Sequence, residues 1–155
     1  HFRNLKDDQI EAIKKSKGLI GLNPYPFFID KSFKETETKE RKKYIDELNS
    51  IERKYSNKTS QWIAKQHFLQ KKLANICPSI EIFVDHIEYV INQIGIDYVG
   101  IGSDYDGLDC LPNKWTDCLD HMIIQESLEK RGYKNTEIEK IMGKNILRVL
   151  EEIDN

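Results

Sequence analysis

Apolar and polar positions follow two different patterns along the chain, and the pattern changes near residue 30 and again near residue 79. Residues 5–17 and 80–94 carry apolar side chains at every third or fourth position, which predicts amphipathic helices. Two short apolar runs, at 19–23 and 96–102, are typical of strands buried on both faces. Because long helical segments separate the two runs, the strands are expected to be parallel.

Capping residues predict where the helices around these strands begin and end. Asn4 is expected to cap the first helix and Ser79 the later one, because their side chains can accept hydrogen bonds from the first free N–H groups of a helix. Gly18 and Gly95 are expected to end the same two helices, since glycine adopts a left-handed turn at low cost.

The last third of the chain predicts two further helices. Thr116 is expected to cap the first, which ends at Gly132, and Thr136 with Glu139 forms a capping box for the second. Gly143 is expected to interrupt that helix before a last amphipathic turn. The apolar positions of the first helix are Leu119, Met122, Ile123 and Leu128.

Residues 31–75 differ from the rest because they are rich in charge and contain neither glycine nor proline. Their spacing predicts two helices separated by a break near 56–60. Charged helices usually face water, so a solvated helical hairpin is the simplest interpretation, and a partner surface is the alternative.

Composition and charge limit the classes of function. The 155 residues include 24 Lys and Arg against 26 Asp and Glu, a net charge of −2 that argues against a dedicated nucleic-acid-binding protein. No apolar run approaches the roughly 20 residues of a membrane span. The 3 cysteines include no CxxC pair, which favours reduced thiols and a cytoplasmic location.

The segment at 100–107 is the most informative for chemistry. It places Asp104 and Asp106 directly after the second strand. In α/β sheets and barrels, ligands bind at the carboxyl ends of strands, which makes Asp104 a candidate catalytic residue. The alternative is an aspartate that only forms a tight turn before Gly107. Arg3 is suited to bind a substrate carboxylate through two hydrogen bonds, and its alternative is an ordinary surface arginine.

The four histidines do not cluster, and we assign no metal ligand within the chain. His67 and His121 lie on predicted helix faces, where surface or packing roles are expected, and His86 beside Asp85 is expected to orient a helix. No HExxH, no glycine-rich phosphate loop and no interpretable Ser-His-Asp set occurs.

Several motifs occur in a fixed order: HFRNL, GLIGLNPY, DHIEYV, GIDYVGIGSDYDG, RGY and GKNILRVL. In order and spacing they resemble the C-terminal part of the membrane (renal) dipeptidase family, zinc-dependent peptidases on a (β/α)8 barrel. The resemblance covers residues 1–29 and 79–151. It implies an α/β fold in which 19–23 is strand seven and 98–102 is strand eight of a metallo-dependent hydrolase TIM barrel. Residues 30–78 are then a helical insertion.

A (β/α)8 barrel typically has about 250 residues. Residues 1–155 are therefore expected to be the C-terminal part of a single barrel domain, with the rest preceding His1. The family's two zinc ions and their ligands are expected in that preceding part, because none of the four histidines matches a ligand. The 155 residues alone are expected to be inactive.

The resemblance also implies roles for individual residues. Asp104 corresponds to the catalytic aspartate that shuttles a proton during dipeptide hydrolysis, and Arg3 to the arginine that holds the substrate's C-terminal carboxylate. A family aromatic residue near that carboxylate falls at Phe28, which lacks a tyrosine hydroxyl. A homodimer is expected from the family. The alternatives are a non-catalytic binding or assembly module that uses the charged helices, and a homologue that has lost its metal ligands.

Overall fold

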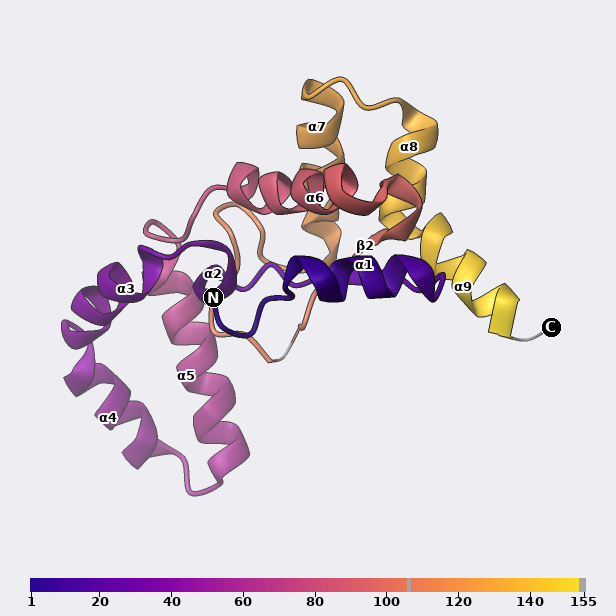
Figure 1. Cartoon of the computed structure of the whole chain (residues 1–155). Helices are drawn as coiled ribbons and strands as arrows, with labels where there is room; N and C mark the ends of the chain where they lie inside the picture. The colour runs from indigo at the N-terminus through magenta and orange to yellow at the C-terminus, as the bar shows by residue number, and fades with distance from the viewer. Residues whose placement is uncertain (106, 154–155) are drawn as a thin grey trace.

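The computed structural model describes residues 1–105 and 107–153. This part of the chain has two short strands, and Figure 1 shows the helices around them. Strands β1 (Ile20–Leu22) and β2 (Val99–Ile101) pair in parallel, as predicted. Gly21 lies opposite Gly100 in the register of the pair. Both strands are shorter than predicted, because Ile96–Tyr98 forms a turn of 3₁₀ helix, η1, before β2 begins.

Helix α6 (Ile80–Ile94) is the central helix of the fold, and its boundaries match the prediction. The Ser79 hydroxyl accepts a hydrogen bond of 3.2 Å from the Glu81 N–H, which satisfies one free donor at the start of the helix. Gly95 ends the helix with a φ of 98°, a conformation that favours glycine. Strong sequence signals at both ends therefore fix this helix.

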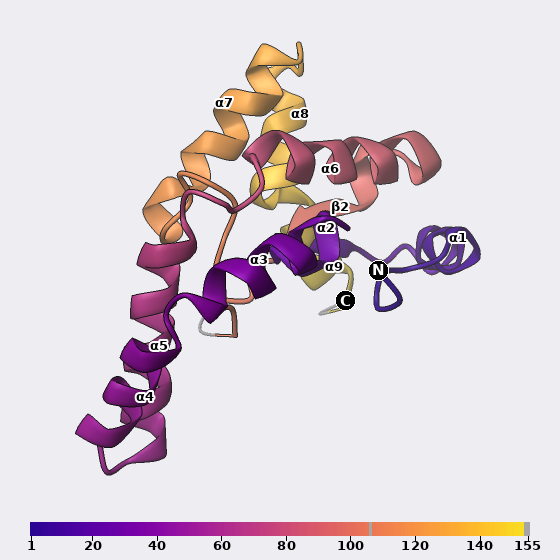
Figure 2. The same cartoon turned by 90° about the vertical axis from the view of Figure 1, so that its left-hand side faces the viewer.

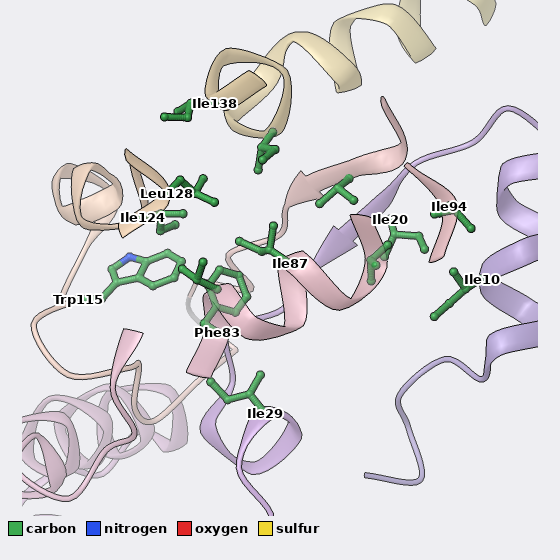
Figure 3. Packing of buried hydrophobic residues seen from close by; sticks show 14 of the residues in the cluster. Ile10, Ile20, Ile29, Phe83, Ile87, Ile94, Trp115, Ile124, Leu128 and Ile138 are labelled. Atoms are coloured by element: carbon green, nitrogen blue, oxygen red, sulfur yellow. The ribbon is translucent and has the colours of Figure 1, made fainter. Parts of the chain in front are cut away.

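The main hydrophobic core forms around α6. Figure 3 shows the α6 side chains Phe83 and Ile87 lying between Ile20 of β1 on one side and Trp115 and Leu128 on the other. Phe83, Ile87 and Leu128 are fully buried. Further core side chains come from α1 (Asp7–Lys15), α2 (Pro26–Ile29), α7 (Met122–Lys130) and α8 (Asn135–Glu139). This core holds β1 and β2 in place from one side.

The predicted interruption of the C-terminal helix at Gly143 is confirmed. Lys140–Lys144 forms a wide π-type turn, η3, which contains Gly143 and separates α8 from α9 (Asn145–Ile153). The buried side chain of Asn145 donates hydrogen bonds to the carbonyl oxygens of Ile96 and Val99, at 2.7 and 2.8 Å. These bonds attach the start of α9 to β2. No helix in the part of the chain that the structure describes is long and apolar enough to cross a membrane.

The charged segment forms three helices rather than the predicted two. They are α3 (Phe33–Lys42), α4 (Ile45–Lys54) and α5 (Lys58–Leu73), and Figure 2 shows α4 and α5 projecting away from the strands. The predicted break before α5 is confirmed, and Asn57 caps α5 by accepting from the N–H of Thr59 at 2.7 Å. The additional break at 43–44 contains no glycine or proline, so no sequence signal marked it.

A second, smaller core holds this segment to the rest of the molecule. Phe33, Leu69 and Leu73 from the helices pack with Cys77 and with Cys110, which lies in the loop after β2. All three cysteines are free, and Cys77 and Cys110 are buried whereas Cys118 is exposed. The hydrogen bond that the Cys110 thiol donates to the Cys77 side chain, together with burial, raises the pKa of the Cys110 thiol. Residues 30–78 thus fold onto the loop that follows Asp104.

Two predictions about the first helix are wrong. Asn4 does not cap α1, because its amide donates instead to the carbonyl oxygen of Phe28, 24 positions away in sequence, at 2.9 Å. The Gln9 side chain satisfies the start of α1 by accepting from the Lys6 N–H at 2.9 Å. At the other end, the residue with positive φ is Lys17 (57°) rather than Gly18.

The predicted caps of the last helices are also wrong. Asp117, not Thr116, caps a 3₁₀ turn, η2 (Cys118–His121), that precedes α7. Glu137 rather than Glu139 accepts from the helix entry, at the Lys134 N–H. In the region of η2 and α7, two side chains that were predicted to lie on the apolar face of the helix are exposed: Leu119 (80%) and Met122 (55%). Polar residues are frequent before both helices, so each helix start had several candidate capping residues within one turn.

Candidate active site

The carboxyl ends of the two strands bring Asn23 and Asp104 into contact. Asn23 follows β1 and Asp104 follows β2, and the Asn23 amide Nδ2 donates to Asp104 Oδ2 at 2.7 Å. One hydrogen bond beyond the strand register, from the Gly102 N–H to the Leu22 carbonyl at 2.8 Å, keeps the two chain segments together up to this point. The parallel pairing of β1 and β2 therefore creates this contact between residues 81 positions apart.

Asp104 sits in a tight turn with a φ of 52°, a left-handed conformation that aspartate tolerates better than most residues. The Gly107 N–H donates to the Asp104 carbonyl at 3.0 Å and closes the turn. A Cβ atom at Gly107 would lie 2.5 Å from Asp104 Oδ1, so only glycine leaves room for this carboxylate. Asp106, the second carboxylate of the motif, lies outside the described residues.

Asn23 orients the Asp104 carboxylate, and the sequence reasoning missed it. Its Oδ1 atom accepts from the Tyr25 N–H at 2.9 Å, which fixes the amide so that Nδ2 faces Asp104. Only Asp104 Oδ2 accepts this bond. A signal was present in the sequence: Asn23 is the first polar residue after β1, at the same edge of the sheet as Asp104.

Arg3 lines a cavity of about 610 Å³ beside the same strand ends. Its guanidinium carbon lies 5.0 Å from the centre of the Phe28 ring, a cation–π contact. Asn23 and Phe28 line the cavity together with Arg3. The other lining residues are mostly apolar and come from the start of the chain, α1, β1, α2 and α6: Asn4, Leu5, Ile10, Ile20, Gly21, Leu22, Ile29, Asp85, His86, Tyr89 and Val90.

The structure thus brings the two residues predicted from sequence to one end of the strand pair. Arg3 and Asn23 line one cavity, and Asn23 is hydrogen-bonded to Asp104. Both Arg3 and Asp104 are exposed, so a ligand can reach them. Phe28, the aromatic position noted from sequence, lies under the Arg3 guanidinium. An exposed cation and an exposed carboxylate on either side of a half-buried amide form a site suited to a small zwitterionic ligand.

A buried polar cluster connects the charged segment to both loops of this site. Arg41 of α3 donates to Asp109 Oδ2 at 2.5 Å, and Arg41 also pairs with Glu37. Tyr25 donates to Asp109 Oδ1 at 3.3 Å. Burial and the Asp109 carboxylate raise the pKa of Tyr25. Because Tyr25 lies two residues after Asn23 and Asp109 five residues after Asp104, this cluster ties the two loops together.

The described residues do not form a metal site by themselves. Among residues 1–105 and 107–153, no group of three or more His, Cys, Asp or Glu side chains could hold a metal ion. Two of the histidines have contacts with neighbouring protein groups. His86 Nε2 lies 3.0 Å from the Ile29 carbonyl oxygen, and His121 stacks on Tyr105 with 5.8 Å between ring centres. We therefore derive no step of a reaction through a metal held by these residues.

The sequence model of the membrane dipeptidase family, peptidase family M19, matches residues 1–155. The chain belongs to the membrane dipeptidase family. The resemblance seen in the motifs is confirmed, and it extends through residues 30–78, which the motifs did not cover.

Fungal dipeptidases are among the relatives in sequence. Dipeptidase aclJ of Aspergillus oryzae is 26% identical over 155 residues, which is 100% of this chain and 27% of that protein. Dipeptidase tcpJ of Claviceps purpurea is 36% identical over 77 residues, which is 50% of this chain and 18% of that protein. The chain therefore matches about a quarter or less of the length of these two curated relatives.

Solved structures of M19 metallopeptidases share the fold. The dipeptidase AC, a metallopeptidase of family M19, superposes with a TM-score of 0.64 at 23% identity, over 96% of this chain and 32% of that one. A metallopeptidase from Rhodobacter sphaeroides, liganded with a phosphinate mimic of the dipeptide L-Ala-D-Ala, has a TM-score of 0.62 at 23% identity, over 96% and 31% of the two chains. The arrangement of helices and strands is therefore that of one part of an M19 fold.

Proposed function

We propose that this membrane dipeptidase family member takes part in the hydrolysis of dipeptides with a free C-terminal carboxylate. The observation that carries the proposal is the hydrogen bond between Asn23 and Asp104 beside the cavity that Arg3 lines. It places a carboxylate and a guanidinium at the carboxyl ends of two parallel strands, where α/β enzymes bind their substrates. In this proposal β1 and β2 are strands seven and eight of a (β/α)8 barrel, and residues 30–78 are an insertion.

In the proposed reaction, Arg3 binds the substrate's carboxylate through charge-assisted hydrogen bonds, with Phe28 supporting the guanidinium from below. Asp104 accepts a proton from the attacking water and returns it to the leaving amine. Asn23 donates to Oδ2 and leaves Oδ1 of Asp104 available for that proton. The hydrogen bonds of Asn23 orient Asp104, and the contact with Phe28 positions the Arg3 guanidinium.

Zinc would supply an activated hydroxide to this reaction when it is bound. The described residues contain no group of three or more His, Cys, Asp or Glu side chains that could hold a metal ion, so they do not provide a complete zinc site by themselves. The 155 residues by themselves are then expected to bind dipeptides weakly and to hydrolyse none. A zinc determination on the protein as its gene encodes it distinguishes this proposal from a homologue without metal.

Replacing Asp104 by Asn tests the proton transfer, because asparagine keeps the shape and also tolerates the positive φ. Dipeptide turnover by the protein as its gene encodes it should fall roughly 10²–10⁴-fold with zinc content unchanged. Asp46→Asn, at an exposed position of α4, is the matched control and should leave turnover unchanged. Wild-type turnover by Asp104→Asn would exclude the proposed role.

Replacing Arg3 by Met tests carboxylate binding. The Michaelis constant should rise about 10- to 100-fold with kcat nearly unchanged, because the contact exists before and during the reaction. The C-terminal amide of the same dipeptide should bind equally poorly to the wild type and to the variant. Arg53→Met on the exposed face of α4 is the control. An unchanged Michaelis constant in Arg3→Met would contradict the role of Arg3.

A further inference from the structure

A second cavity, of about 330 Å³, lies between helix α5 and the loop that follows Asp104. We call it the α5 cavity. Its volume is at the lower end of the range for ligand pockets. Tyr105, the residue directly after Asp104, is one of its walls. Its other lining residues are Trp62, Ile63, Gln66, His67 and Gln70 of α5 and Leu108, Cys110, Leu111, Thr116, Asp117 and Cys118 of the loop.

The α5 cavity and the cavity at Arg3 have no lining residue in common, and Asp104 connects them. On one side, Asp104 is hydrogen-bonded to Asn23, which lines the Arg3 cavity. On the other side, it is followed by Tyr105, which lines the α5 cavity. Figure 2 shows α5 and the N-terminal end of the chain in different parts of the molecule. Asp104 lines neither cavity itself, but it is joined to the wall of each, by the hydrogen bond to Asn23 and by the peptide bond to Tyr105.

The wall of the α5 cavity contains a buried hydrogen-bond acceptor without a partner. Gln66 Oε1 is inaccessible to solvent and has no hydrogen-bond partner among the described residues. Buried acceptors of this kind are rare, because the loss of hydration is not compensated. A neighbouring amide is satisfied: Gln70 Nε2 donates to the Thr116 carbonyl at 3.0 Å and closes the gap between helix and loop. Gln66 Oε1 is thus an acceptor without a partner on a residue that lines the cavity.

The remaining lining of the α5 cavity favours a positively charged donor on an apolar stem. Trp62 and Tyr105 provide aromatic surface, which attracts cations. Asp117 is an exposed carboxylate at the cavity, and no lysine or arginine is among the described residues that line it. Ile63 and Leu108 add aliphatic surface. A lysine side chain combines an aliphatic stem with a terminal ammonium that can donate to Gln66 and to Asp117.

We propose that the α5 cavity binds the side chain of the substrate's first residue and prefers lysine. This inference rests on the proposed function, because the carboxylate at Arg3 determines which end of a dipeptide faces the α5 cavity. It assigns substrate selection to the insertion at 30–78, through Trp62 and Gln66, and gives these charged helices a role in the reaction besides covering the strand ends. Gln66 is then the residue that determines specificity.

Cys118 allows the α5 cavity to be tested without measuring activity. It lines the cavity and is exposed, whereas Cys77 and Cys110 are buried. A methanethiosulfonate reagent will therefore label Cys118 first, and mass spectrometry of peptides identifies the labelled position. The aminoethyl reagent carries an ammonium group and the sulfonatoethyl reagent a sulfonate. With each rate divided by that of the unfolded chain, the cationic reagent should react about tenfold faster than the anionic one.

Protection of Cys118 from labelling then measures the preference for lysine. L-Lysinamide should protect at a concentration about tenfold lower than L-norleucinamide, which has the same stem without the ammonium. Gln66→Leu and Asp117→Asn should each reduce this difference, and Gln125→Leu, outside the cavity, should not. Equal protection by the two amides, or no protection by either, would overturn the inference.

The design separates failure of this inference from failure of the proposed function. Lysinamide has no carboxylate, so its protection of Cys118 should be the same in wild type and in Arg3→Met. Binding of Ala-Ala should instead depend on Arg3 and be unaffected by Gln66→Leu. If Ala-Ala binds wild type and Arg3→Met with equal affinity while lysinamide still protects Cys118, the proposed function is wrong. The α5 cavity is then still a binding site. If lysinamide does not protect Cys118 but Ala-Ala binding depends on Arg3 as expected, only the inference about lysine is wrong.

Discussion

The two regions of the molecule are stabilised by different interactions. Residues 1–29 and 79–153, which we call the strand unit, pack a large apolar core around α6. Residues 30–78, the insertion of our proposal, have a much smaller core and contact the loop after β2 through the buried Glu37 and the partly buried Arg41 and Asp109. The strand unit therefore provides a rigid support for Asp104 and Arg3, and the insertion attaches to it by a few specific contacts.

This difference indicates which part of the site is fixed by the core and which part can adjust. The contact between Asn23 and Asp104 depends on strand pairing and on the core behind it. The α5 cavity instead depends on how α5 sits against the loop after β2. We expect substitutions in the strand unit to affect the whole fold, and substitutions in the insertion to act mainly on the α5 cavity.

The largest effect is expected from Phe83→Ala in the main core. Phe83 is fully buried on α6, and its truncation should lower the free energy of unfolding by about 3–5 kcal/mol. Phe33→Ala is the matched change in the insertion, where the side chain is equally buried. Chemical denaturation measures the loss, and hydrogen exchange locates it.

The comparison of regions requires that the two variants differ in where exchange increases. Phe83→Ala should increase amide exchange throughout the chain, whereas Phe33→Ala should increase it mainly in α3, α4 and α5. If Phe33→Ala instead raised exchange equally in β1, β2 and α6, the two regions would unfold as one unit and the distinction would fail.

Arg41→Met tests the charged contact between insertion and loops. It leaves the carboxylates of Glu37 and Asp109 without their cation, and Glu37 is only 5% exposed. The expected loss is about 2 kcal/mol, less than for a fully buried pair because Arg41 is partly solvated. Lys39→Met breaks an exposed pair with Glu35 and should cost about 0.5 kcal/mol or less. If denaturation showed equal losses of unfolding free energy in the two variants, the Arg41 cluster would contribute no more to stability than an exposed ion pair.

The two N-caps allow the same comparison at smaller scale. Ser79 caps α6 in the strand unit and Asn57 caps α5 in the insertion. Each change to Ala should cost about 1 kcal/mol. Ser79→Ala should lower the global unfolding free energy, whereas Asn57→Ala should appear as faster exchange within α5 and weaker protection of Cys118 by lysinamide. A global loss from Asn57→Ala as large as that from Ser79→Ala would remove the predicted difference.

The smallest effect is a pH dependence in the strand unit. Hydrogen bonds from Arg131 and Ser127 lower the pKa of Glu81 in the folded state. Glu81 therefore contributes stability above its unfolded pKa of about 4.3, and the contribution is lost as the pH falls through the folded pKa. Because Glu81 is half exposed, the amount should be below about 1 kcal/mol.

Arg131→Met should flatten the acid limb of the stability curve measured between about pH 5 and pH 3. Lys65→Met, which removes the exposed partner of Glu52 in the insertion, is the matched control and should change that limb less. An acid limb unchanged by Arg131→Met would show that Glu81 does not contribute.

Local signals in the sequence predicted the elements that local chemistry determines. The apolar spacing of α6, with Ser79 before it and Gly95 after it, fixed both ends of that helix. The short apolar runs identified β1 and β2, and the long connection between them predicted their parallel pairing. Arg3 and Asp104 were named as candidates, and the structure places both at one end of the strands.

Contacts between distant residues could not be predicted in the same way. Asn4 was assigned to the nearest helix, but its amide bonds to Phe28, which only the folded chain brings close. Trp62 and Gln66 belonged to a charged segment, and nothing in their spacing indicated a cavity with Tyr105. The sequence marks Asn23 as the first polar residue after β1, but its hydrogen bond to Asp104 depends on how the two loops fold beyond the strands.

The two-stranded sheet has a practical consequence for work with these 155 residues alone. Within the described residues, β1 and β2 pair only with each other, so each strand has an outer edge that no further strand covers, although Asn145 binds the Val99 carbonyl of β2. Exposed edges of this kind recruit strands from neighbouring molecules. The isolated chain should therefore self-associate before it unfolds, and sulfate-rich buffers that strengthen apolar burial should accelerate precipitation. Dilution and low salt, rather than added stabilisers, are the conditions in which its chemistry can be measured.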